Sequence, residues 1–125
     1  MILDTNALSA VAEGETGATQ QVSRAGQVAI PVIVLGEYRF GIAQSRRRRE
    51  YERWLEELVT VSRVLDVNEE TAIGYARIRV QLKETGTPIP SNDAWIAALG
   101  LQHSLPILSR DRHFDFVKGL QRLAW

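Results

Sequence analysis

Hydrophobic residues along the chain form two kinds of pattern, short apolar runs and longer stretches with helical spacing. Short apolar runs are typical of buried strands, and they occur at Met1–Leu3, Val28–Val32, Val64–Val67 and Pro106–Leu108, with a fifth at Leu120–Leu123. Helical spacing fills the intervals, at Leu8–Glu13, Ala18–Ala25, Ile33–Gln44, Arg47–Ser62, Glu69–Glu84 and Asp93–His103. Strands that alternate with helices predict an α/β fold, a parallel sheet with helices on both faces.

The length and composition are those of one globular domain, residues 1–125. Hydrophobic residues make up 45% of the chain, which excludes disorder for most of it. The formal net charge is zero, so a nucleic-acid partner would have to be held by a local basic patch. There is no cysteine, which excludes disulfides, a thiol nucleophile and a thiolate metal site.

No segment of the sequence is suited to a membrane or to export. The longest apolar run, residues 28–36, contains Pro31 and is far shorter than the roughly 18 residues of a membrane span. The chain starts Met1-Ile2-Leu3-Asp4, without a basic region ahead of an apolar stretch. We therefore expect no membrane partner and a cytoplasmic location.

Two acidic residues follow predicted strands. Asp4 comes directly after the first strand, and Asp111 comes three residues after the run that ends at Leu108. Open parallel sheets place functional groups beyond the carboxyl ends of their strands, so both side chains are expected at one edge. Each also has a structural interpretation, Asp4 as a helix N-cap and Asp111 as a turn residue.

Two further acidic residues lie on predicted helices. Glu37 interrupts an apolar helix, where an unpaired charge would cost several kcal/mol. It must therefore be neutralised, paired with an arginine such as Arg39, or bound to a cation. Asp93 lies in the first turn of a helix that follows Pro88 and Pro90. On its own, Asp93 is explained by the helix dipole, a stabilisation of about 0.3–1 kcal/mol.

The arrangement of these four acids predicts a metal site. Carboxylates brought within a few ångströms repel each other unless a cation offsets their charge. Oxygen ligands without cysteine or a close histidine pair favour Mg²⁺ or Mn²⁺ over zinc. Such an ion could activate water for attack on a phosphodiester. A phosphatase with a nucleophilic aspartate is disfavoured, because Asn6 stands where its second acid is needed. His113 is interpreted as a loop residue rather than a base.

Four segments, in this order, resemble the PIN-domain ribonucleases and, among them, the VapC-like toxins of toxin–antitoxin pairs. They are Ile2-Leu3-Asp4-Thr5-Asn6, Glu37-Tyr38-Arg39-Phe40-Gly41, Pro90-Ser91-Asn92-Asp93-Ala94-Trp95 and Leu108-Ser109-Arg110-Asp111-Arg112-His113-Phe114. The resemblance covers essentially the whole chain. It implies a three-layer α/β/α fold with a central, mainly parallel sheet of four to five strands, and a metal-dependent endoribonuclease activity.

The resemblance also implies roles for single residues and for partners. Asp4, Glu37, Asp93 and Asp111 would form the catalytic metal site for Mg²⁺ or Mn²⁺. Asn6 and Ser109 would be polar neighbours that hold ligands or water, and Asp115 would be a substitute or additional ligand. The partners implied are RNA as substrate, a second copy of the chain in a homodimer, and a VapB-like antitoxin whose tail occupies the groove over the acids. An antitoxin arginine in the acidic pocket would replace the charge of the metal.

Several arginines could contact RNA or the antitoxin. Arg46, Arg47, Arg48 and Arg49 open a helix. They form either a solvated face with weak pairs such as Arg48 with Glu52 and Arg53 with Glu57, or a grip for RNA phosphates or the antitoxin. Arg39 and Arg112 stand beside proposed ligands, where they either balance charge or engage phosphate.

Two alternative functions remain open at this point. A PIN-type nuclease that processes RNA without an antitoxin would share every residue of the site. A catalytically silent RNA-binding module is disfavoured, because four carboxylates would repel RNA phosphates unless a metal is bound. The apolar residues of the helix at Glu69–Glu84 are predicted to lie in the core, with part of that face open to a dimer contact. They are Ala72, Ile73, Ala76, Val80 and Leu82.

Overall fold

A computed structural model describes all 125 residues and contains one five-stranded sheet. The strands are β1 (Ile2–Leu3), β2 (Ala29–Pro31), β3 (Arg63–Leu65), β4 (Ile107–Leu108) and β5 (Arg122–Leu123). Their order is β3-β2-β1-β4-β5, and every neighbouring pair is parallel. This confirms the α/β class and the five predicted strands, with β1 at the centre of the sheet.

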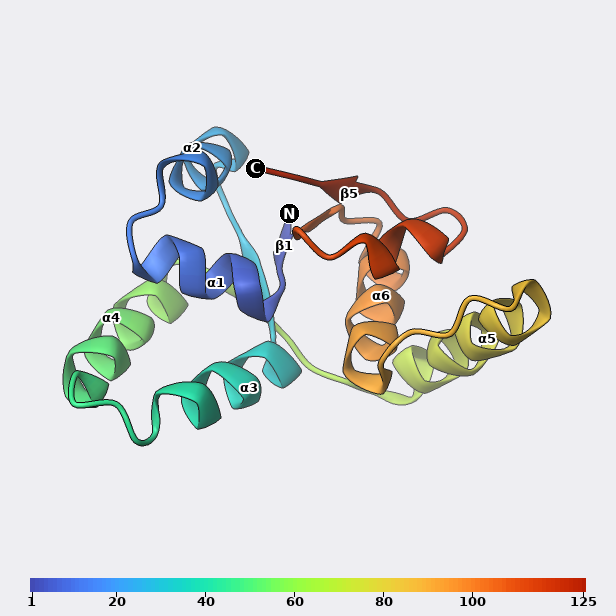
Figure 1. Cartoon of the computed structure of the whole chain (residues 1–125), viewed down its shortest axis with the longest axis horizontal. Helices are drawn as coiled ribbons and strands as arrows, with labels where there is room; N and C mark the ends of the chain where they lie inside the picture. The colour runs from blue at the N-terminus through green and yellow to red at the C-terminus, as the bar shows by residue number, and fades with distance from the viewer.

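Six α-helices and one short 3₁₀-helix connect the strands. They are α1 (Thr5–Ala12), α2 (Thr16–Ala25), α3 (Val32–Ile42), α4 (Arg48–Thr60), α5 (Glu69–Thr85), α6 (Ser91–His103) and η1 (Arg112–Phe116). All six predicted helices are present. Figure 1 shows α1 to α4 on one side of the strands and α5 and α6 on the other, as expected for a sheet covered on both faces. None of the helices combines the length and the apolar character needed to cross a membrane.

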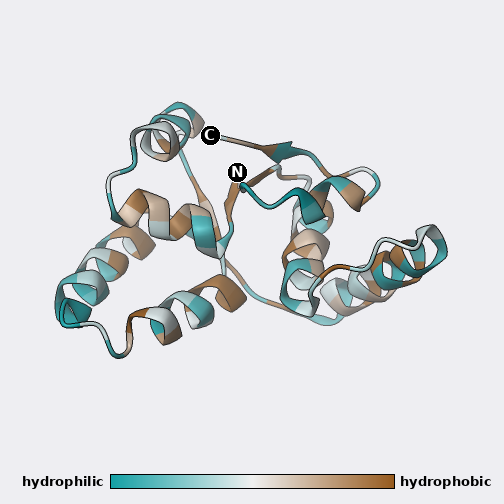
Figure 2. Cartoon of the chain, viewed as in Figure 1, coloured by the Kyte–Doolittle hydropathy of each residue, from teal (hydrophilic) through white to brown (hydrophobic).

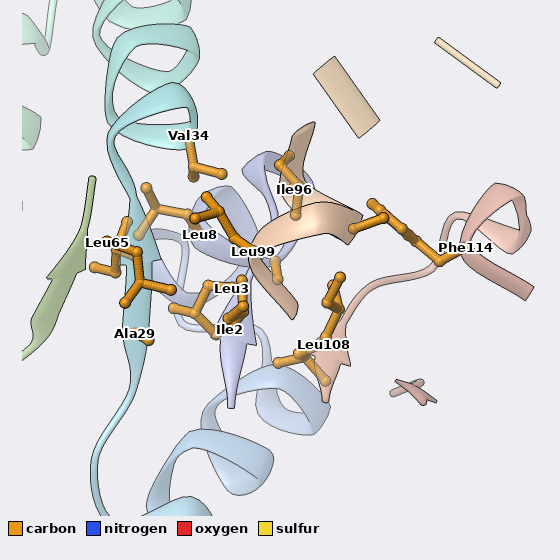
Figure 3. Packing of buried hydrophobic residues seen from close by; sticks show 14 of the residues in the cluster. Ile2, Leu3, Leu8, Ala29, Val34, Leu65, Ile96, Leu99, Leu108 and Phe114 are labelled. Carbon is orange, nitrogen blue, oxygen red and sulfur yellow. The ribbon is translucent and has the colours of Figure 1, made fainter. Parts of the chain in front are cut away.

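The core contains 24 buried apolar residues that join the sheet to both layers of helices. Ile2 and Leu3 of the central strand are fully buried. Figure 3 shows them beside Leu99 of α6, with Val34 of α3 above them and Phe114 of η1 at the outer end of the labelled cluster. In Figure 2 the central strand β1 is hydrophobic, whereas α4 is mainly hydrophilic, in keeping with its position on the outside. The core therefore holds the carboxyl ends of the strands and the starts of α1, α3 and α6 together.

The prediction for the apolar residues of α5 was mostly wrong. Leu82 is buried, but Ile73 is 51% and Val80 is 57% exposed, and Ala72 and Ala76 are exposed as well. Among the helices, α5 packs mainly against α6, so only one stripe of it is covered. The buried residues of that stripe are Thr71, Ile78 and Leu82. The apolar residues outside this stripe face outward because no other helix covers them.

Candidate functional site

The first part of the candidate site lies where β1 and β4 end side by side. Leu3 pairs with Leu108 in the sheet, so the next residues, Asp4 and Ser109, are neighbours. The Ser109 hydroxyl donates a hydrogen bond to Asp4 Oδ2. The Ala7 backbone N–H donates to Asp4 Oδ1 at 2.7 Å, so Asp4 is also the N-cap of α1. Asp4 is therefore both the N-cap of α1 and a neighbour of the other acids.

The turn after β4 carries Asp111 and brings His113 beside it. The Asp111 backbone N–H donates to Ser109 Oγ at 2.9 Å, and Asp111 caps η1 by accepting the His113 backbone N–H at 2.9 Å. In the His113 ring, Nδ1 lies 2.9 Å from Asp111 Oδ1 and 3.6 Å from Asp93 Oδ2. This nitrogen is buried but has no hydrogen-bond partner, so its closeness to the carboxylates is not an aligned hydrogen bond.

Glu37 approaches the cluster from α3. Its carboxylate accepts a hydrogen bond from the Thr5 hydroxyl at 2.9 Å, which ties α3 to the start of α1. Glu37 is half-buried and forms no ion pair, and Arg39 is exposed. The partner proposed from sequence, Arg39, therefore does not neutralise Glu37, and the carboxylate stays available to a cation.

The electrostatics of Asp4 and Asp93 show that the four acids act on each other. Burial raises the pKa of Asp4 despite its two hydrogen bonds, and the charges of Asp111 and Glu37 raise it further. Burial also raises the pKa of Asp93, to about 6, with further contributions from Asp111 and Asp4. Asp93 lies in the first turn of α6, as predicted. Asp111, Glu37 and Asp4 therefore each raise the pKa of at least one neighbouring acid of the four.

The raised pKa of Asp93 predicts how stability depends on pH when metal is removed. Between its ordinary value of 3.8 and about 6, Asp93 binds more protons in the folded than in the unfolded chain. Stability must then fall as the pH rises through this range. From pH 5 to pH 7 we expect the wild type, in EDTA, to lose about 1 kcal/mol more unfolding free energy than Asp93→Asn. Equal losses in urea denaturation of the two proteins would contradict this.

The donors in the cluster fit a divalent metal ion. Asp93, Asp111 and His113 each offer one ligand atom, and these atoms lie within 4.8 Å of one another. Carboxylate oxygens suit Mg²⁺ and Mn²⁺. Mutual repulsion that raises the pKa of carboxylates is the condition that a bound cation relieves. The residues present can therefore hold the ion that was expected from the sequence.

Other predicted residues of the site lie outside this cluster. Both carboxylate oxygens of Asp115 accept hydrogen bonds from Arg122, at 2.8 and 3.0 Å. Arg122 also donates to the Ser109 carbonyl at 3.0 Å, so Asp115 braces the turn that holds Asp111. The remaining three are exposed and form no ion pair or side-chain hydrogen bond. They are Asn6, Arg39 and Arg112.

The four consecutive arginines, Arg46–Arg49, line a hollow of about 430 Å³ at the turn between α3 and α4. Arg47 donates to both carboxylate oxygens of Glu50, at 3.1 and 2.9 Å. Arg48 lies 3.6 Å from Glu52, which is one of the predicted weak pairs. The first and last arginines of the run are exposed and form no ion pair, so they are free to bind an external anion.

Sequence reasoning missed three residues that the fold brings to the site. The sequence indicates a loop residue at His113, and it gives no signal for Thr5 or Arg122. The only sequence signal for His113 is its position two residues after Asp111. Arg122 lies in β5 and binds Asp115 of η1, and Thr5 lies in α1 and binds Glu37 of α3. These contacts depend on the tertiary structure.

The chain is similar to known proteins in both sequence and structure. The family profile described as "PIN domain" matches residues 1–120. Ribonuclease VapC5 of Mycobacterium tuberculosis is 30% identical over 123 residues, which cover 94% of this chain and 87% of that protein. A solved structure of VapBC-5 from Mycobacterium tuberculosis, a member of the VapBC family of toxin–antitoxin systems, matches with a TM-score of 0.73 and 28% identity. The match covers 98% of this chain and 94% of that one.

The fold is shared with more distant structures as well. VapBC2 from Rickettsia felis, solved with a DNA fragment from its promoter, matches with a TM-score of 0.89 at 19% identity, over 99% of this chain and 97% of that one.

Proposed function

Because this chain belongs to the PIN domain family, in its VapC-like branch, we propose that it is a metal-dependent endoribonuclease and the toxin of a type II toxin–antitoxin pair. The proposal is carried by the grouping of ligand atoms from Asp93 and Asp111, together with the charge effects of Asp4 on Asp93 and of Glu37 on Asp4. Their mutual effects on the pKa values of Asp4 and Asp93 support a cation there. The likeness to Ribonuclease VapC5 supports RNA as the substrate.

The side chains of the cluster have separate tasks in this proposal. Asp93 and Asp111 would hold Mg²⁺ or Mn²⁺, with Asp4 and Glu37 completing the negative pocket. The bound ion supplies Lewis-acid chemistry, because it lowers the pKa of coordinated water and offsets phosphate charge. Ser109 orients two of the acids, because its hydroxyl donates to Asp4 and accepts from the Asp111 backbone. Thr5 orients Glu37 in the same way.

The test is cleavage of a mixed RNA pool by the purified full chain in Mg²⁺, in Mn²⁺ or in EDTA. We expect cleavage with either metal and none in EDTA. Two results with freshly purified, folded and antitoxin-free protein would contradict the proposal. The first is cleavage without added metal, and the second is no cleavage with any metal. The second result would favour a silent RNA-binding module instead.

The free arginines of the α3–α4 turn give a prediction for RNA binding. Replacing Arg46 and Arg49 by alanine should weaken binding and reduce the slope of log K against log salt by about one to two, because each phosphate contact releases counterions. Fluorescence anisotropy of a labelled RNA at several salt concentrations measures the slope. Arg24→Ala, which removes an exposed arginine on α2, is the matched control, and an unchanged slope in the double variant would exclude this contact.

We also propose two protein partners. A VapB-like antitoxin would cover the acidic cluster and place an arginine there, a role supported by the likeness to a structure from a toxin–antitoxin system. A second copy of the chain would cover the outward apolar side chains of α5, Ile73 and Val80. The antitoxin proposal would be contradicted if added antitoxin failed to inhibit cleavage. The dimer proposal would be contradicted if sedimentation analysis showed a monomer. An RNA-processing nuclease without an antitoxin would show the same cleavage but no such inhibition.

A further inference from the structure

One nitrogen atom lies inside the acidic cluster without a partner. His113 Nδ1 is buried and forms no hydrogen bond, although it lies 2.9 Å from Asp111 Oδ1. That oxygen already accepts the His113 backbone N–H. A buried polar atom without a hydrogen-bond partner is unfavourable. The ring nitrogen therefore calls for a partner other than the side chains around it.

We propose that His113 is a ligand of the metal ion, binding through Nδ1 beside Asp93 and Asp111. The proposal rests on the metal-dependent function proposed above. Neighbouring ligands of an octahedral ion, with bonds of about 2.1 Å, lie about 3 Å apart, and opposite ligands lie about 4.2 Å apart. The 2.9 Å separation of Nδ1 from Asp111 Oδ1 matches that of neighbouring ligands, and the 3.6 Å separation from Asp93 Oδ2 lies between the two values.

The local fold explains why the nitrogen lies there. Asp111 caps η1, and the backbone N–H of His113 is the group that it caps. This turn places the imidazole directly beside the carboxylate. Phe114, the next residue, is fully buried and fixes the turn against the core. The backbone of the turn is therefore enough to place the ring beside Asp111.

A nitrogen ligand changes which metal the site prefers. Carboxylates bind Mg²⁺ and Mn²⁺, whereas imidazole suits transition metals better than Mg²⁺. His113 should therefore favour Mn²⁺ over Mg²⁺ at this site. The competing interpretation is that a protonated His113 pairs with the acids in place of a metal. In that case the ring would compete with the ion, and its removal would strengthen metal binding.

The first experiment is calorimetric titration of the metal-free full chain with Mn²⁺ and, separately, with Mg²⁺. We expect His113→Asn to weaken Mn²⁺ binding about tenfold or more and Mg²⁺ binding less than about threefold, because asparagine offers oxygen in place of nitrogen. His103→Asn is the matched control, because His103 contacts Arg63 instead. Unchanged or tighter Mn²⁺ binding by His113→Asn would overturn the proposal.

The second readout is pulsed electron paramagnetic resonance of the Mn²⁺-loaded protein, which does not depend on cleavage. Coupling to a directly bonded nitrogen is expected in the wild type and in His103→Asn and should be lost in His113→Asn. Mn²⁺ that binds without nitrogen coupling would overturn the role of His113 while leaving the metal site intact. A wild-type protein that binds no Mn²⁺ would overturn the role of His113 and the metal-dependent function together.

Discussion

An Asp93→Asn variant is expected to cleave RNA at least about 100-fold more slowly than the wild type, an increase of about 2.7 kcal/mol in the activation free energy. Asparagine has nearly the shape of aspartate, so α6 can still begin at Ser91. The substitution removes one of the negative charges that hold the ion, and an amide is a weaker ligand for a hard cation. The same change removes repulsion from Asp111, so the metal-free variant should be at least as stable as the wild type at pH 7.

Single-turnover cleavage in Mg²⁺, combined with thermal unfolding, separates these two effects. Asp66→Asn is the matched control. Asp66 also comes directly after a parallel strand, but β3 is at the edge of the sheet and Asp66 is exposed. Its replacement should leave cleavage within about twofold of the wild type. An Asp93→Asn variant that keeps more than a tenth of the wild-type rate would show that the cluster is not the nuclease site.

The order of the elements was predictable because each change from strand to helix is marked in the sequence. Pro31, for example, ends β2 and stands directly before α3. The start of α1 was harder to place, because the apolar pattern begins at Leu8 whereas the helix begins at Thr5. The cap that Asp4 provides extends the helix by a turn, and apolar spacing does not record this hydrogen bond.

The buried face of α5 was the clearest failure of the apolar pattern. The stripe that packs against α6 includes Thr71, whose hydroxyl donates to Gln102 at 2.5 Å, and Gly74, where an added Cβ would lie 3.7 Å from Ala98. A small residue and a hydroxyl give no hydrophobic signal. Ile73 and Val80 give a strong one but face outward, so hydropathy alone assigned the wrong face.

The acids of the site were predictable from residue type and place, because parallel strands bring their carboxyl ends to one edge. The resemblance implies Ser109 as a polar neighbour of these acids, but the sequence does not show which acid it binds. Ser109 and Asp4 are 105 residues apart, and only the pairing of β1 with β4 brings them together. The resemblance implies Asp115 as a substitute or additional ligand. In the structure its carboxylate pairs with Arg122, which also binds the Ser109 carbonyl, and this structural contact gives no signal in the sequence.

Replacing Phe114 by alanine is expected to lower the free energy of unfolding by about 3–5 kcal/mol, the usual loss for a buried aromatic ring. Phe114 is fully buried and lies in η1, in contact with the core seen in Figure 3. Whole domains are stable by about 5–15 kcal/mol, so a large share of the total would be lost. Urea denaturation measures the change.

Replacing Phe114 should also weaken metal binding at the proposed site, because η1 begins at the cap formed by Asp111 and carries His113. With the ring removed, this turn loses its anchor in the core, and Mn²⁺ binding should weaken even at temperatures where the variant is folded. Phe116→Ala is the matched control: its ring is in the same 3₁₀-helix but 44% exposed, so its removal should cost less than about 1 kcal/mol. Equal losses of stability in the two variants would show that η1 is not anchored through Phe114.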